Sequence, residues 1–173
     1  MRGFSATYDL SYHSGGVRGF NPPGDYASRF LMMVNGHNMA DHIFDSMLWF
    51  GVDFPIEMNL IKQIEIIRGP GATLWGANAV NGVINIRSKS AQETQGFLLY
   101  GGAGDQETGF GGVRYGGTIG ANTAYRVYAL HQSRDSLRLA GGADAQDASD
   151  ITQGGFRIDS KIQPNDTLTL QGD

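Results

Sequence analysis

The sequence contains no cysteine, only five prolines and no long apolar segment. Without cysteine, a disulfide framework and a thiolate metal site are both excluded. The longest apolar runs are a few residues, such as Phe30–Val34, whereas a membrane-spanning helix needs about 20 mostly apolar residues. The first residues also lack the apolar core of a secretory signal. Any contact with a membrane is therefore expected to run through β-strands.

Neither positive nor negative charge strongly predominates. The chain has 13 basic and 17 acidic residues and a net charge of −4. No cluster of Lys and Arg is suited to a phosphate backbone, so we expect no nucleic-acid partner. No Ser/His/Asp arrangement or pair of acids stands out as catalytic. We therefore expect a protein that is not an enzyme and holds no cofactor.

Glycine is abundant, with 26 of 173 residues. Four glycines lie in Ile64–Ile86, "IEIIRGPGATLWGANAVNGVINI", between two strand-like halves. A phosphate loop would need Lys and a hydroxyl residue after its last Gly, but Ala77 and Asn78 follow Gly76. We interpret these glycines as geometric, since Gly permits turns with positive φ and close backbone contact.

The chain changes character near residue 90. Before it, apolar runs of four to six residues end at Gly, Pro or Asn, which favours short strands over helices. Glu57–Lys62, after Pro55, is the best candidate for a short helix. This region is predicted to be a small mixed β-sheet with short helices, of the α+β class.

After Lys89 the sequence predicts about five antiparallel strands. In the clearest example, Phe156, Ile158 and Ile162 share one face. Such alternation is typical of transmembrane barrel strands, but a soluble sheet with one face on a core produces it too. The runs are Gly96–Gly102, Gly112–Ile119, Ala124–Gln132, Phe156–Ile162 and Asp166–Gln171.

Four motifs resemble the plug domain of TonB-dependent outer-membrane receptors. They are "GVRGF" at Gly16–Phe20, "MMVNGHNM" at Met32–Met39, the long run Phe54–Ile86 and the closing Arg87–Lys89. The resemblance covers residues 1–90, and residues 96–173 resemble the first strands of the barrel. It implies an α+β plug domain followed by antiparallel strands of an incomplete transmembrane β-barrel.

The resemblance also implies a function. Such receptors take up a scarce large solute, often a ferric siderophore or cobalamin, with energy delivered by TonB, ExbB and ExbD. For this chain we expect a ferric siderophore. The plug lies in the barrel lumen in the outer membrane of a Gram-negative bacterium, and lipid surrounds the barrel. The TonB-contacting segment is expected to be missing from this chain. The rival interpretation is a soluble periplasmic or orphan plug-like binding module without transport activity.

Arg18 and Arg68 each lie in a strand-like apolar run and precede a Gly. A partly desolvated guanidinium there needs carboxylate partners, with Glu65 a local candidate for Arg68; the alternative is that both arginines extend to solvent from strand ends. The resemblance implies that they pair with glutamates of the barrel wall and lock the plug in place.

The remaining candidate residues are glycines and possible cargo contacts. Trp75 offers an aromatic face to an organic chelate, and its alternative role is to pack under its own loop. His37, Asp41, His42 and Asp45 form no closed ligand set, so no metal site is expected. The cargo contacts that we expect are Trp75, Asn78, His37, Asn38 and Tyr26. The structural turn glycines are Gly19, Gly36, Gly69, Gly71, Gly76 and Gly82.

A transmembrane barrel needs at least about eight strands and closure of the sheet. The sequence predicts only about five, so we expect it to be an internal piece of a longer receptor. Strands left unpaired would expose edges and an apolar face. The isolated chain is therefore expected to aggregate or to remain disordered after about residue 95.

Overall fold

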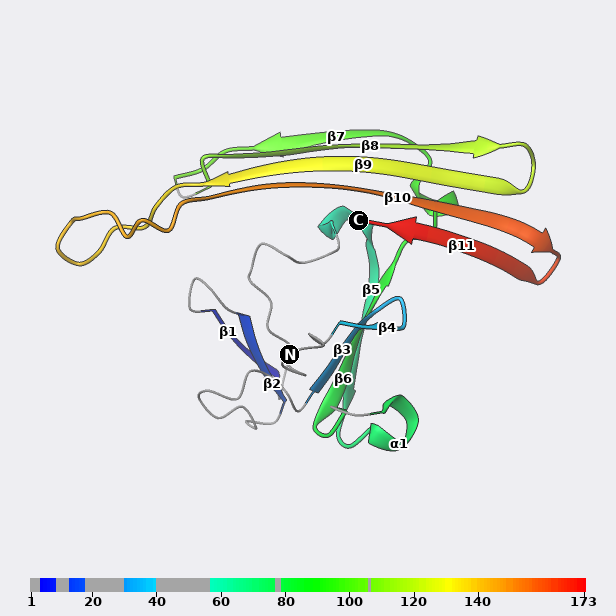
Figure 1. Cartoon of the computed structure of the whole chain (residues 1–173), viewed down its shortest axis with the longest axis horizontal. Coiled ribbons are helices and arrows are strands. Elements are labelled where there is room, and N and C mark those ends of the chain that lie inside the picture. The colour runs from blue at the N-terminus through cyan, green and yellow to red at the C-terminus, as the bar shows by residue number, and fades with distance from the viewer. Residues whose placement is uncertain (1–3, 9–12, 18–29, 40–56, 77–78, 106) are drawn as a thin grey trace. The chain divides into compact units, whose positions relative to one another are not determined.

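The computed structural model describes residues 4–8, 13–17, 30–39, 57–76, 79–105 and 107–173 (Figure 1). The chain divides into two compact units, Met1–Ser88 and Lys89–Asp173. Each unit has its own sheet.

The main sheet of the first unit is mixed, with the strand order β4-β3-β6-β5. β3 pairs with β6 in parallel, whereas β4 and β5 pair in antiparallel fashion with β3 and β6. A separate antiparallel hairpin joins β1 and β2 (Figure 1). The predicted mixed sheet is therefore confirmed. The strands are β1 Phe4–Tyr8, β2 His13–Val17, β3 Phe30–Val34, β4 His37–Asn38, β5 Ile61–Arg68 and β6 Gly82–Ser88.

The turn between β3 and β4 is built from Asn35 and Gly36, whose φ angles are 52° and 83°. A two-residue hairpin turn with positive φ at both positions favours Asn followed by Gly. The Asn35 side chain also donates to Ser88 Oγ at 2.9 Å and accepts from the Ser88 backbone N–H at 2.8 Å. These bonds tie the hairpin to the end of β6.

The core of the first unit lies around β6, whose apolar residues are buried. Because β6 is a central strand between β3 and β5, both of its faces can be covered, and it needs no alternation of polar residues. A cluster of buried side chains forms here, and Trp75 packs against it. Its members are Leu31, Met33, Ala79 and Val83.

The helix predicted at Glu57–Lys62 is wrong in length and type. Only Met58–Leu60 is helical, as the 3-10 turn η1, and Ile61 and Lys62 already belong to β5. Glu57 caps the turn by accepting from the Asn59 backbone N–H at 3.2 Å. The β-branched residues that follow favour the strand. A four-residue helix, α1 Ala72–Trp75, follows β5 instead.

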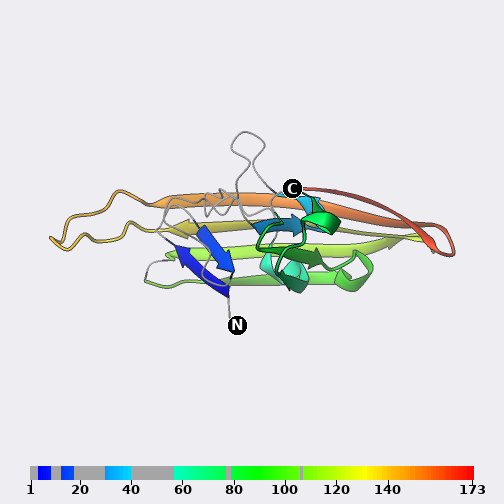
Figure 2. The ribbon, with the colours of Figure 1, turned by 90° about the horizontal axis from the view of Figure 1, so that it is seen from below.

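The second unit is a five-stranded antiparallel sheet in chain order, β7 to β11. Figures 1 and 2 show its long strands side by side. The predicted antiparallel strands are confirmed, and within the described part of the chain the sheet ends at β7 and β11. The strands are β7 Gly96–Gly102, β8 Gly109–Ile119, β9 Thr123–Arg134, β10 Ser149–Gln163 and β11 Asp166–Gly172.

Among the described residues, no helix is long and apolar enough to cross a membrane. The second unit has one further 3-10 turn, η2 Gln92–Thr94, which precedes β7.

Five glycines in the second sheet stand opposite aromatic residues. In each of five cross-strand pairs, a Cβ added to the glycine would lie 3.0 Å or less from an atom of the facing ring. An aromatic ring that covers a facing glycine supplies the packing that glycine lacks. The pairs are Tyr100 with Gly112, Phe110 with Gly102, Tyr125 with Gly117, Tyr128 with Gly155 and Phe156 with Gly172.

Candidate functional site

One face of the five-stranded sheet is apolar and exposed. Phe97 and Leu99 in β7 are 67% and 70% exposed, far more than expected for an aromatic or leucine side chain of a packed sheet. Contiguous exposed apolar surface of this kind marks a contact with a membrane, a ligand or another protein. We call it the apolar face, and its residues are Phe97, Leu99, Val113, Tyr115, Ile119, Val127, Phe156, Leu168 and Leu170.

The opposite face carries charged and polar side chains. Arg126 in β9 and Asp159 in β10 are only 4% and 9% exposed. Arg157 donates from Nε to both carboxylate oxygens of Asp159 at 2.9 Å. A buried charge needs such a partner, because its desolvation is otherwise uncompensated. We call this the polar face, and its residues are Arg114, Arg126, Tyr128, Gln153, Arg157, Asp159, Thr169 and Gln171.

The glycine-rich segment after β5 is a compact turn in the first unit. Gly69 has a φ of 109° and donates from its backbone to the Asn81 carbonyl at 3.0 Å. Gly71 donates to the Ala79 carbonyl at 2.8 Å, and Gly76 has a φ of 89°. The loop thus closes on itself through backbone bonds and returns the chain to Gly82, the first residue of β6.

Trp75, at the end of α1, packs against the buried cluster of the first unit. A Cβ at Gly71 would lie 3.2 Å from its Cδ1 atom, so the glycine gives the ring room. Its neighbour Leu74 is 86% exposed. The geometry supports the packing role of Trp75 under its loop, and a cargo contact would have to use the remaining exposed part of the ring.

Arg68 is the exposed last residue of β5, opposite Gly82. The local counter-charge expected from Glu65 does not reach it: Glu65 accepts from Asn85 Nδ2 at 2.9 Å and pairs with Arg87 at 3.4 Å. Strand alternation explains this, since residues 65 and 68 point to opposite faces.

His37 and Asn38 form β4 and are exposed. The other candidates, Arg18, Gly19, Tyr26 and Asn78, lie outside the described residues, as do Asp41, His42 and Asp45. Within the ranges that are described, no group of three or more His, Asp or Glu is placed to hold a metal ion.

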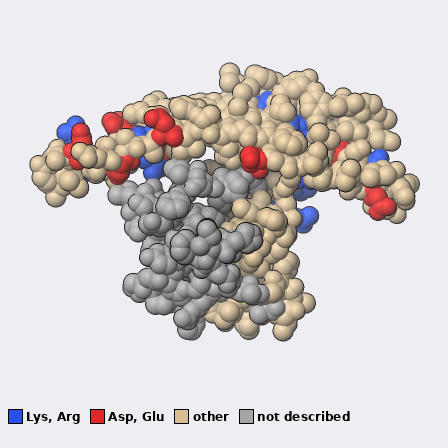
Figure 3. Space-filling view, viewed as in Figure 1, with Lys and Arg blue, Asp and Glu red and all other residues tan. Residues whose placement is uncertain are grey.

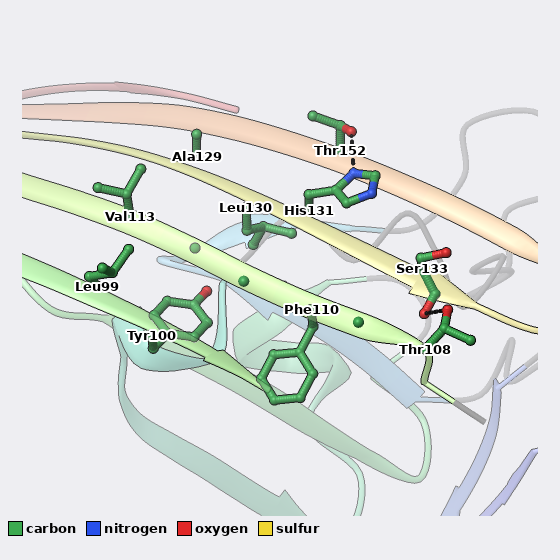
Figure 4. Close-up of a pocket in the computed structure, with 13 residues that line it drawn as sticks. Leu99, Tyr100, Thr108, Phe110, Val113, Ala129, Leu130, His131, Ser133 and Thr152 are labelled. Atoms are coloured by element: carbon green, nitrogen blue, oxygen red, sulfur yellow. Dashed lines mark hydrogen bonds between the residues drawn. The ribbon is translucent and has the colours of Figure 1, made fainter. Parts of the chain in front are cut away.

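A shallow pocket lies over β8 where Gly109 and Gly111 carry no side chains (Figure 4). Leu99, Val113 and Ala129 give it an apolar wall, and a hydrogen bond of 2.9 Å joins His131 Nδ1 and Thr152 Oγ1 at its rim. Its lining holds no pair of titratable groups suited to acid–base work.

The loop between β9 and β10 is held by its own hydrogen bonds. The Leu139 backbone donates to the Ala143 carbonyl, and the Leu137 backbone donates to Asp147 Oδ1, both at 2.8 Å. Figure 3 shows acidic and basic side chains gathered at this end of the sheet. These bonds fix the loop backbone and the Asp147 carboxylate.

Comparison with known proteins identifies relatives of both units. The family model described as the TonB-dependent Receptor Plug Domain matches residues 2–83. The chain is 29% identical over 139 residues to the vitamin B12 transporter BtuB of Vibrio vulnificus (strain CMCP6), an alignment that covers 78% of this chain and 19% of the relative.

Two solved structures share the fold. The ferric yersiniabactin uptake receptor FyuA from Yersinia pestis superposes with a TM-score of 0.70 at 20% identity, over 92% of this chain and 25% of the receptor. The copper transporter OprC gives a TM-score of 0.68 at 17% identity, over 98% of this chain and 25% of that protein. The chain thus spans about a fifth to a quarter of the length of these proteins.

Proposed function

Because the chain belongs to the family of TonB-dependent receptors, we propose that it is part of an outer-membrane receptor for the energy-coupled uptake of a scarce large solute. Receptors of this family are outer-membrane proteins of Gram-negative bacteria, with the plug inside the barrel, and they are transporters rather than enzymes. We assign residues 1–90, which contain the first unit, to the plug domain, and residues 96–173 to the first barrel strands.

The observation that carries this proposal is the two-faced sheet of β7–β11. Its apolar face suits contact with lipid, and its polar face suits the interior of a barrel, which is the pattern of outer-membrane strands. A soluble periplasmic or orphan plug-like module is the alternative. It would have to leave Phe97, Leu99 and Leu170 in water, or cover them with another protein.

A ferric siderophore is the cargo that we favour. FyuA is named for the uptake of a ferric siderophore, yersiniabactin. The names of BtuB and OprC point to other cargoes, vitamin B12 and copper. Trp75, His37, Asn38, Tyr26 and Asn78 are the residues that we propose for cargo contact.

In the mechanism that we propose, cargo binding displaces the plug and TonB, with ExbB and ExbD, draws on the proton-motive force to open the path. Arg68 and Arg18 act as the lock by pairing with glutamates of the barrel wall. Arg68 lies at a strand end, exposed within the described first unit, which leaves its guanidinium accessible to a carboxylate from elsewhere.

The proposal is tested by deleting the gene for the full receptor and measuring growth on a panel of ferric siderophores, cyanocobalamin, haem and copper as limiting nutrients. We expect loss of growth on one ferric siderophore, restored by the gene in trans. Cell fractionation separates the alternatives, because the receptor must be recovered in the outer membrane. Recovery in the soluble periplasm would contradict the proposal and favour the binding module.

A further inference from the structure

The segment Lys89–Gln95, which precedes β7, is held against the polar face of the sheet by three strands. The Ala91 backbone N–H donates to Oδ2 of Asp159 in β10 at 2.7 Å. Arg126 in β9 donates from Nη1 to the Lys89 carbonyl oxygen at 2.5 Å. The backbone of Thr94 and Gln95 passes over Gly116 in β8.

The carboxylate that accepts from Ala91 is also held by two other side chains. Asp159 accepts from Arg157 Nε with both oxygens at 2.9 Å, and from Thr169 Oγ1 at 2.7 Å. Hydrogen bonds to an ionised group of this kind are about twice as strong as neutral ones. The carboxylate therefore has a set orientation, and the Ala91 N–H meets an acceptor that needs no rearrangement.

Gly116 gives the segment its place on β8. A Cβ at this position would lie 2.9 Å from the Thr94 carbonyl carbon and 3.0 Å from the Gln95 Cα. Both are backbone atoms, which cannot turn aside as the end of a flexible side chain can. Any residue other than Gly would push the segment off the sheet.

The segment is also compact in itself. Ser90 donates from its backbone to Glu93 Oε2 at 2.9 Å, and Thr94 Oγ1 donates to the Ser90 carbonyl at 3.0 Å. Gln95 Nε2 donates to the Ala91 carbonyl at 2.7 Å. Ala91 and Thr94 are 0% and 1% exposed. A short connector would not need such burial if its only task were to join two units.

We propose that Asp159, Arg126 and Gly116 form an anchor that keeps Lys89–Gln95 fixed on the strands while the plug is displaced. The inference rests on the proposed function, since displacement of the plug belongs to uptake. Local opening starts where contacts are few. The anchor makes the attachment point costly to open, so displacement stops at about Ser88 and does not pull β7 out of the sheet. These three are positioning residues.

Hydrogen–deuterium exchange of the full receptor in outer-membrane vesicles, at increasing urea, tests the anchor. We expect peptides of β5 and β6 to lose protection first, and the peptide 89–95 to lose it together with β9 and β10. Asp159→Ala lowers the protection of the Ala91 amide about tenfold or more, as expected for a lost bond to a charged group. Asp150→Ala, an exposed position in the same strand, is the matched control.

Gly116→Ala disrupts the same anchor through a clash with the backbone of Thr94 and Gln95, and should also release the segment. Gly109→Ala in the same strand is its control, because a Cβ there meets open space. The anchor is overturned if 89–95 exchanges with the plug peptides in the native receptor, or if both anchor variants keep its protection. Measuring uptake by the cells from which the vesicles are prepared separates the anchor from the proposed transport function. Normal uptake with early loss of protection overturns the anchor alone, and retained protection without TonB-dependent uptake overturns the proposed function alone.

Discussion

Tyr100 in β7 stands directly opposite Gly112 in β8, and its ring fills the space that a side chain at Gly112 would occupy. A Cβ built there would lie 2.7 Å from the Cε1 atom of Tyr100. The ring can occupy this space only because Gly112 has no side chain. Pairs of this kind account for part of the high glycine content of the second unit.

Gly112→Ala is therefore expected to destabilise the sheet by about 1–3 kcal/mol, the usual cost of overpacking a filled site. Gly109→Ala, in the same strand, meets open space and should change stability little. Urea unfolding of the full receptor in detergent, followed by heat-modifiable migration, measures both. Equal midpoints for the two variants would contradict the packing role of Tyr100.

Leu99 and Leu98 are neighbours in β7 whose side chains point to opposite faces. This chain has no cysteine, so a cysteine introduced at either position is the only thiol in these 173 residues. It can carry a thiol-linked fluorophore in a receptor whose remaining cysteines, if any, are replaced. In vesicles with doxyl-labelled lipid, the fluorophore at Leu99→Cys should be quenched strongly and that at Leu98→Cys weakly. Similar quenching at both positions would contradict the assignment of the apolar face to lipid.

Arg68→Ala removes the proposed lock between the plug and the barrel wall. We expect it to loosen the plug and to sensitise cells to large antibiotics that the outer membrane normally excludes. Arg87→Ala is the control, because its pair with Glu65 is exposed and such pairs contribute about 0–1 kcal/mol. Growth in the presence of vancomycin measures the effect. Equal sensitivity of both variants would remove the special role of Arg68.

Trp75→Ala is expected to lower the stability of the plug by about 1–3 kcal/mol, less than for a fully buried aromatic residue, because it opens space beside the core cluster. If the ring also touches cargo, affinity for the ferric siderophore falls about tenfold as well. Trp75→Phe should restore much of the packing, and Leu74→Ala is the exposed control. Equilibrium binding to the full receptor gives the affinities. An unchanged affinity in Trp75→Ala would leave only the packing role.

The strands of the second unit could be predicted because alternation is a local property of the sequence. In Phe156–Lys161, the face of each residue follows from its position in the strand, whereas the register of β10 with β11 shifts at Ile162. The helix predicted at Glu57–Lys62 failed because pairing of β5 with β6 outweighed the local signal after Pro55. Helix propensity is weak against such tertiary contacts.

Long-range partners could not be predicted. Asp159 reads as one polar residue of an alternating strand, and nothing near it in the sequence points to Ala91, 68 positions earlier. The same limit applies to Glu65, whose partners Asn85 and Arg87 lie in another strand. The role of Gly116 can also be recognised only once the backbone that passes over it is known.

The most direct test of the account is the initial rate of radiolabelled ferric siderophore uptake by cells that make the full receptor. The rate is compared in cells with and without TonB, and before and after a protonophore is added. We predict uptake that requires the receptor gene, and that falls to background when either TonB or the proton-motive force is removed. Uptake that persists without TonB, or cells that take up the siderophore equally well without the receptor, would contradict it.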